Sequence, residues 1–125
     1  MGLFSGLMGN ASEVNLESLQ KEYQNILAGS ERIEKAYKLI RDLFIFTDKR
    51  LILVDKQGMT GKKTEYHSIP YRSITHFSIE TTGHFDLEAE LKIWISGTAL
   101  PIEKQFNSDS NIYELQQVLA FYTLR

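Results

Sequence analysis

The chain has 125 residues, no cysteine, and a net charge of −2 from 14 basic and 16 acidic side chains. This length suits one domain that buries a continuous core without covalent staples. A sequence without cysteine excludes a disulfide framework, thiolate metal ligands and thiol redox chemistry, and it suits a reducing cytoplasm. The charge predicts no broad attraction to nucleic acid or anionic lipid, and no apolar run approaches the ~20 residues of a membrane-spanning helix. We therefore expect a soluble, cytoplasmic protein with no nucleic-acid partner.

Residues 1–11 are expected to be flexible or to form one short helix. Their apolar residues would share a helical face, but the glycines among them make an isolated helix marginal. The plain interpretation is packing against the rest of the protein or a copy of it; the alternative is an amphipathic contact with a membrane, for which the segment has no Lys or Arg. Residues 12–125 are predicted to form a single domain. The apolar residues of the segment 1–11 are Leu3, Phe4, Leu7 and Met8.

Residues 15–28 have the apolar spacing of an amphipathic helix of about three to four turns. Asn15 is a suitable N-cap, and Gly29 is a suitable stop. The apolar stripe needs a surface to cover, and the best candidate is the hairpin that follows. The apolar stripe of this helix comprises Leu16, Leu19, Tyr23, Ile26 and Leu27.

Residues 41–56 are predicted to form an antiparallel hairpin around the polar break at residues 47–50. Residues 43–46 and 51–54 are apolar throughout, whereas a strand with one wet face would alternate. Both faces must therefore be buried, one in the core and the other under a helix or a neighbouring chain. Residues 31–40 fit a helix or a strand on pattern alone, and a strand is favoured because the open side of the hairpin needs a partner.

Further strands and a final helix are expected in the second half of the chain. Trp94 falls among charged residues on an outer strand face, where a large aromatic side chain usually indicates that something covers it. Pro101 removes a ladder donor and indicates an edge strand, while Phe77 and Ile79 are expected to face inward. A helix from residue 112, capped by Asn111, would plug a curved antiparallel sheet. The strands are residues 64–70, 74–82, 86–95 and 98–106, with a tight corner at 70–73.

Two stretches, FTDKRLILVDKQGMTGKK and YHSIPYRSITHFSIET, resemble the bacterial pleckstrin-homology (PH) domain family, once catalogued as a domain of unknown function. The turn at residues 47–50 and the corner at residues 68–74 carry most of the resemblance, which covers residues 12–125. It implies a mainly β, PH-like bent antiparallel barrel with a C-terminal capping helix and an added N-terminal helix. It also makes residues 31–40 the first strand, implies ring-like homo-oligomers formed through sheet and helix surfaces, and supplies no catalytic residues.

Relatives that bind phosphoinositides hold the phosphates with Lys and Arg spaced across the first strand pair. The equivalent residues here, Lys35, Lys38 and Arg41, are immediately followed by Asp42. This departure disfavours binding of a lipid headgroup at that place.

Three other patterns are interpreted as ordinary surface. Residues 58–64, GMTGKKT, lack the four residues between glycines that a phosphate-binding loop requires. Three histidines have neither helical i, i+4 spacing nor a completing acid or thiolate for a metal. Three acids share one strand face, which predicts a solvated face or a docking surface for a basic partner rather than an acid–base pair. The histidines are His67, His76 and His84, and the acids are Asp86, Glu88 and Glu90.

We predict a non-enzymatic interaction module that assembles with itself and holds an unidentified protein, with no catalytic residue, cofactor or metal. The expected interface comprises Leu16, Leu19, Tyr23, Phe44, Phe46, Ile52, Val54 and Trp94. The alternative, a module for membrane surfaces or anionic phospholipid, is less favoured because its basic patch would attract phosphates only weakly and in a salt-sensitive way. That patch, near the hairpin turn and the following loop, comprises Lys49, Arg50, Lys56, Lys62 and Lys63.

Overall fold

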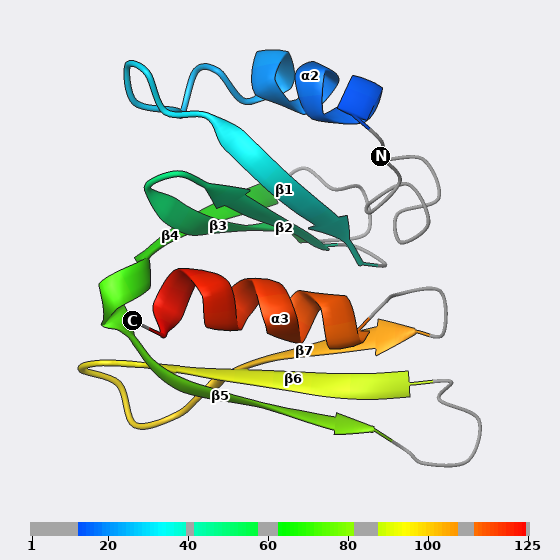
Figure 1. Cartoon of the computed structure of the whole chain (residues 1–125), viewed down its shortest axis with the longest axis vertical. Coiled ribbons are helices and arrows are strands. Elements are labelled where there is room, and N and C mark those ends of the chain that lie inside the picture. The colour runs from blue at the N-terminus through cyan, green and yellow to red at the C-terminus, as the bar shows by residue number, and fades with distance from the viewer. Residues whose placement is uncertain (1–12, 40–41, 58–62, 82–87, 108–111, 125) are drawn as a thin grey trace. The chain divides into compact units, whose positions relative to one another are not determined.

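The computed structural model describes residues 13–39, 42–57, 63–81, 88–107 and 112–124, drawn in colour in Figure 1. The chain forms two compact units, Met1–Ile69 and Pro70–Arg125, and the single domain expected for residues 12–125 stays a prediction. Across the described ranges, no helix is long and apolar enough to cross a membrane. Several predictions lie outside the described residues: those for residues 1–11, Arg41, Lys62, His84, Asp86 and the Asn111 cap.

The first unit contains a helix and a four-stranded sheet. Strands β1 to β4 are neighbours in chain order, and β1 pairs antiparallel with β2 and β2 with β3. The ambiguous stretch at residues 31–40 is therefore a strand, as the family resemblance implied. The elements are α2 (Glu13–Glu22), β1 (Ile33–Lys38), β2 (Asp42–Thr47), β3 (Arg50–Gln57) and β4 (Lys63–Pro70).

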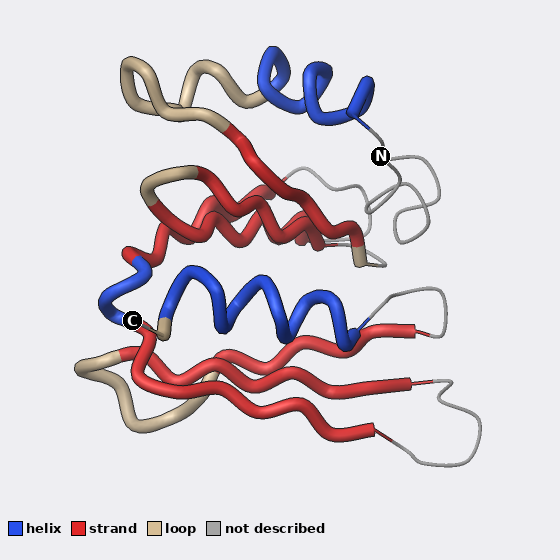
Figure 2. Tube along the Cα trace, viewed as in Figure 1, coloured by secondary structure: helices blue, strands red, loops and turns tan. Residues whose placement is uncertain are grey.

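The β2–β3 hairpin is buried on both faces, as predicted. On one face, the cross-strand pairs are Phe44 with Leu53 and Phe46 with Leu51, and all four side chains are buried. The other face belongs to a core cluster onto which α2 and the turn after it pack, so this face is covered by a helix of the same chain (Figure 2). The cluster contains Tyr23, Ile33, Ile45, Ile52 and Val54, with Leu16, Leu19, Ile26, Leu27 and Leu43 packed against it.

Helix α2 differs from the predicted helix at both ends. It spans residues 13–22 rather than 15–28, so Asn15 lies inside the helix and is not its cap. Beyond it, tertiary hydrogen bonds take backbone groups that a longer helix would use. The Ala28 N–H donates to Glu31 Oε1 over 2.9 Å, and the Ile26 carbonyl accepts from Arg50 Nη2 over 2.7 Å.

The second unit begins with a 3-10 turn at the predicted corner and continues into a three-stranded antiparallel sheet, ordered β5-β6-β7, and a C-terminal helix. Strand β7 lies at the sheet edge, as Pro101 indicated, although the strand begins one residue after the proline. Gly97, with a φ of 89°, supplies a left-handed residue in the β6–β7 connection. The elements are η1 (Tyr71–Ser73), β5 (Ile74–Thr81), β6 (Glu88–Ile95), β7 (Ile102–Asn107) and α3 (Ile112–Thr123).

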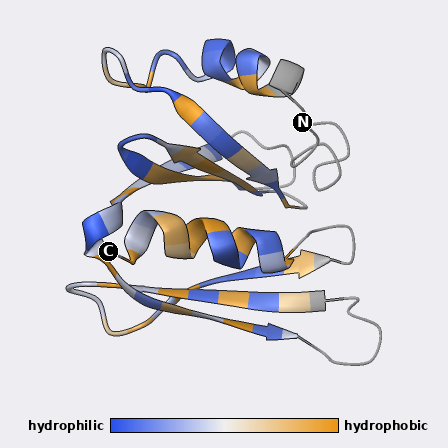
Figure 3. Ribbon diagram, in the orientation of Figure 1, coloured by the Kyte–Doolittle hydropathy of each residue, from blue (hydrophilic) through white to orange (hydrophobic). Residues whose placement is uncertain are grey.

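Strand β6 alternates between apolar and polar residues, as predicted (Figure 3). Leu91 and Ile93 are fully buried, and their cross-strand partners Ile79 and Phe77 are half-buried on the same face, which agrees with their predicted inward direction. Helix α3 packs against β5 and η1, and Tyr122 stacks on Tyr71 with ring centroids 4.6 Å apart. The buried apolar face of α3 comprises Ile112, Leu115, Val118, Leu119 and Tyr122.

One side chain of α2 is hydrogen-bonded to the backbone of the residues that lead into β1. Gln20 Nε2 donates to the Glu31 carbonyl over 3.1 Å, and Gln20 Oε1 accepts from the Ile33 N–H over 2.8 Å. Because the amide bonds one carbonyl and one N–H two residues apart, it occupies two positions that a neighbouring strand could use. The helix is thereby fixed to the sheet edge as well as to the hairpin face.

We expect Gln20→Ala to destabilise the chain by about 1–3 kcal/mol, because it leaves a part-buried N–H and carbonyl without their partners. Urea unfolding measures this loss, and amide hydrogen exchange should accelerate at Ile33. Glu17→Ala, at an exposed position of the same helix, is the matched control and should change stability by less than about 0.5 kcal/mol. Equal effects of the two substitutions would contradict the anchoring role.

Candidate functional site

Five of the eight residues predicted at an oligomer interface are buried within one chain. Tyr23, Ile52 and Val54 belong to the cluster under α2, and Phe44 and Phe46 have no exposed surface. This burial leaves the five side chains little or no surface for a second copy, and their role at an interface stays a prediction. The remaining three, Leu16, Leu19 and Trp94, are half-buried and keep part of their surface.

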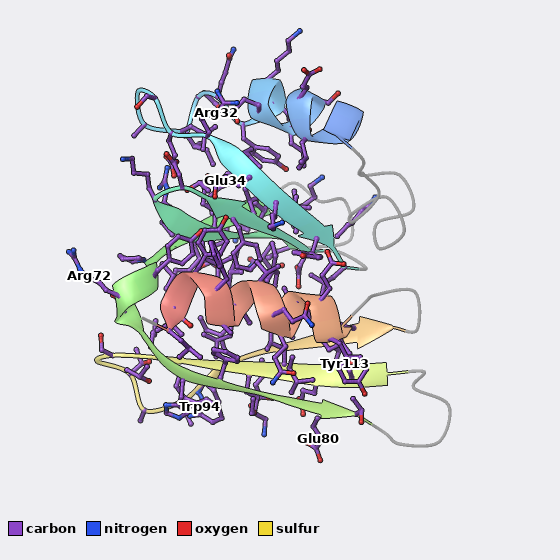
Figure 4. The ribbon with its side chains drawn as sticks, viewed as in Figure 1. Arg32, Glu34, Arg72, Glu80, Trp94 and Tyr113 are labelled. Atoms are coloured by element: carbon purple, nitrogen blue, oxygen red, sulfur yellow. The ribbon has the colours of Figure 1, made fainter. Side chains whose placement is uncertain are left out.

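Trp94 lies on the outer face of the β5-β6-β7 sheet, pointing away from α3 like Glu80 (Figure 4). Its cross-strand partner His76 stacks on the indole, with ring centroids 4.4 Å apart and planes 16° from parallel. The Thr75 hydroxyl donates to the Trp94 carbonyl over 3.1 Å, next to a register shift between Ile74 and His76. A large aromatic side chain on an outer sheet face predicts that something covers it. His76 provides part of that cover for Trp94.

The acidic face predicted on β6 is partly described. Glu90 lies directly opposite Glu80 in the β5–β6 register, and like charges in that arrangement repel each other. The side chain of Glu88 is not described. Among the described residues, no three His, Cys, Asp or Glu side chains gather closely enough to hold a metal ion. Docking of a basic partner on this face stays a prediction.

The predicted basic patch is not brought together. Lys49 lies in the β2–β3 turn and Lys56 near the opposite end of β3, which places them roughly 20 Å apart at about 3.3 Å per residue. Lys56 and Lys63, by contrast, are both exposed and flank the connection between β3 and β4. The usable part of the patch among the described residues is therefore this pair.

Arg50 is held in a polar network at the turn end of the hairpin. Its Nε and Nη2 donate to the two carboxylate oxygens of Glu31 over 2.8 and 2.9 Å. Nη2 also donates to the Ile26 carbonyl, and Nη1 donates to the Ser68 hydroxyl, both over 2.7 Å. The Thr47 hydroxyl donates to Glu31 Oε2 over 2.6 Å and accepts from the Arg50 N–H over 2.9 Å. Four of the five guanidinium N–H groups are thus used within the chain, so Arg50 serves the fold rather than an anion site.

Glu31 is the charged centre of this network, and its side chain is 1% exposed. Burial raises the pKa of Glu31, but hydrogen bonds from Arg50, Thr47 and the Ala28 N–H outweigh it and lower the pKa from 4.5 to about 2. The hydrogen bond to Glu31 in turn raises the pKa of Arg50. A carboxyl whose folded pKa lies below its unfolded value stabilises the protein above the unfolded pKa, and this contribution is lost as the pH falls towards the folded one.

Comparison with known proteins places these observations in a family. A model described as the bacterial PH domain matches residues 2–123. The chain belongs to the bacterial PH domain family. Two uncharacterized Bacillus subtilis proteins resemble this family member over nearly their whole length. YjqA is 60% identical over 121 residues, covering 96% of this chain and 97% of YjqA, and YozO is 33% identical over 120 residues, covering 96% of each.

Two solved structures also resemble this bacterial PH domain. A pleckstrin homology domain from Shewanella amazonensis has a TM-score of 0.84 and 53% identity, covering 94% of this chain and 95% of that one. A DUF1696 family protein with a pleckstrin-homology domain from Shewanella loihica has a TM-score of 0.78 and 50% identity, covering 90% and 97%. The predicted PH-like fold is confirmed: the described residues form seven strands in two sheets, a C-terminal helix and a short N-terminal helix.

We expect Glu31→Gln to destabilise the chain by about 2–4 kcal/mol at neutral pH, because Arg50 loses its buried counter-charge. The wild-type chain should lose about 3 kcal/mol as the pH falls from above 4.5 towards 2, and the variant should lack this component. Urea unfolding at stepped pH values measures both effects.

Glu65→Gln is the matched control, because Glu65 is an exposed carboxylate on β4. It should leave the neutral-pH stability within about 0.5 kcal/mol of wild type and should keep the acid dependence. An acid dependence that persists unchanged in Glu31→Gln would show that other carboxylates cause it.

Proposed function

We propose that this bacterial PH domain is a non-enzymatic interaction module that assembles with copies of itself, in the ring-like manner implied for its family, and presents the assembled surface to another protein. The observation that carries the proposal is the placement of large apolar side chains in water on the second unit. Phe121, Leu124 and Tyr113 are 75%, 65% and 61% exposed, and Leu100 is 81% exposed. Three of these side chains lie on or beside α3, and exposed apolar groups that share one surface are typical of protein contacts.

The polar groups of the described residues support the same proposal. Glu31 is the carboxyl whose pKa is most clearly displaced, and it is enclosed by Arg50 and Thr47 hydrogen bonds, an arrangement that stabilises the fold. A group poised for acid–base chemistry would instead have its pKa moved towards neutrality and would face a substrate. The exposed residues thus favour recognition of another protein surface over chemistry.

Self-assembly predicts a concentration-dependent mass. Light scattering on the purified full chain should give multiples of 14.4 kDa that decrease on dilution. Trp94 is the single tryptophan, so its fluorescence should change over the same concentration range if a copy covers the outer sheet face. A mass of one chain at every concentration would contradict the proposal.

A second candidate, an anionic-lipid surface module, is favoured by one observation: Lys56 and Lys63 are exposed together beside the β3–β4 connection. This candidate predicts that the chain sediments with anionic vesicles at low salt and is released at about 0.5 M salt. Replacing both lysines with Gln should abolish the binding, whereas Lys49→Gln, at the other end of β3, should not. Equal indifference to anionic and neutral vesicles removes this candidate.

A further inference from the structure

Helix α3 turns one face to its own sheet and the other to water. Its exposed side chains include Tyr113, Phe121 and the adjoining Leu124. Because successive helical residues are rotated by about 100°, Tyr113, Gln117 and Phe121 form one i, i+4, i+8 row, with Leu124 beside it. Gln117 is exposed as well. An aromatic ring therefore lies one turn before and one turn after the same exposed amide.

The exposed face of α3 carries no charge. Glu114 is the one charged residue between Ile112 and Thr123, and it is buried. Surface helices ordinarily place charged residues opposite their apolar stripe, whereas the centres of protein interfaces are depleted of charge and enriched in aromatic residues. The helix also lacks the Lys and Arg that attract an amphipathic helix to anionic lipid. The face therefore suits an uncharged protein surface.

We propose that this face pairs with the same face of a second copy, with the two α3 helices antiparallel about a two-fold axis at Gln117. The inference rests on the proposed self-assembly and names one of its contacts. In this arrangement Tyr113 of each copy faces Phe121 of the other, because both lie four residues from the axis. The two Gln117 amides meet on the axis, where each can donate and accept a hydrogen bond. The row is thus self-complementary, which is the condition for a two-fold contact.

The size of the face indicates how strong the contact is. Aromatic side chains bury about 150–250 Å² each when fully covered, and Tyr113, Phe121 and Leu124 are only partly exposed, so together they offer roughly 300–400 Å² per copy. A standard interface buries about 800 Å² on each partner. The α3 contact alone is therefore a weak, reversible one. Because a two-fold contact closes after two copies, it adds to a ring contact formed elsewhere and does not replace it.

Cross-linking tests the position of the axis. The chain has no cysteine, so Gln117→Cys introduces a single thiol at the proposed axis, and Gln116→Cys introduces one at a neighbouring exposed position off the row. With dissolved oxygen as oxidant, Gln117→Cys should form a disulfide dimer at least tenfold faster than Gln116→Cys. Similar rates for the two variants, or no dimer from Gln117→Cys in protein that light scattering shows to be assembled, would overturn the α3 contact while leaving self-assembly intact.

Sedimentation velocity over a concentration series tests the aromatic row. Phe121→Glu should weaken the association at least tenfold, because it places a carboxylate against Tyr113 of the other copy. Gln24→Glu, which adds the same charge at an exposed position of the turn after α2, should not. Circular dichroism checks that both variants fold. Association unchanged by Phe121→Glu would overturn the α3 contact alone, whereas a monomeric wild-type chain at all concentrations would overturn both the contact and the proposed function.

Discussion

The β2–β3 hairpin offers water no polar side chain on either face along residues 43–46 and 51–54, and the first unit is organised by this constraint. One face is completed by helix α2 and the turn after it, which place their apolar stripe over Ile45, Ile52 and Val54. Burial of a large aliphatic side chain contributes about 1.5–3 kcal/mol, so this cover is a main source of stability for the unit. The hairpin needs no second copy to complete this face.

The network around Glu31 fixes the cover in place. A buried carboxylate is costly unless it is paired and hydrogen-bonded, and here the pairing joins the turn after α2, the end of β2, the start of β3 and Ser68 on β4. Because each partner comes from a different segment, removing one charge leaves the others unsatisfied. The network thus supplies directional contacts where the apolar cluster supplies non-directional ones.

The two units differ in what they leave at the surface. In the first unit, the apolar stripe of α2 is turned onto the hairpin. In the second, α3 buries one apolar face and carries the exposed rings of Tyr113 and Phe121 on the opposite side. Since exposed aromatic and aliphatic side chains in water are unfavourable, the proposed contact between copies is placed on the uncovered side of α3.

Local patterns predict the doubly buried hairpin and most of the strands, because periodicity and turn residues act over a few positions, whereas residues 31–40 fit a helix or a strand on pattern alone. Tertiary structure alone decided which charges pair and which apolar residues stay outside. The sequence places Arg50 among the basic residues near the hairpin turn, but its partner Glu31 lies 19 residues away, and no local pattern connects the two. Phe46 and Phe121 are equally apolar, yet one is buried and the other exposed, since exposure depends on what the rest of the chain packs against.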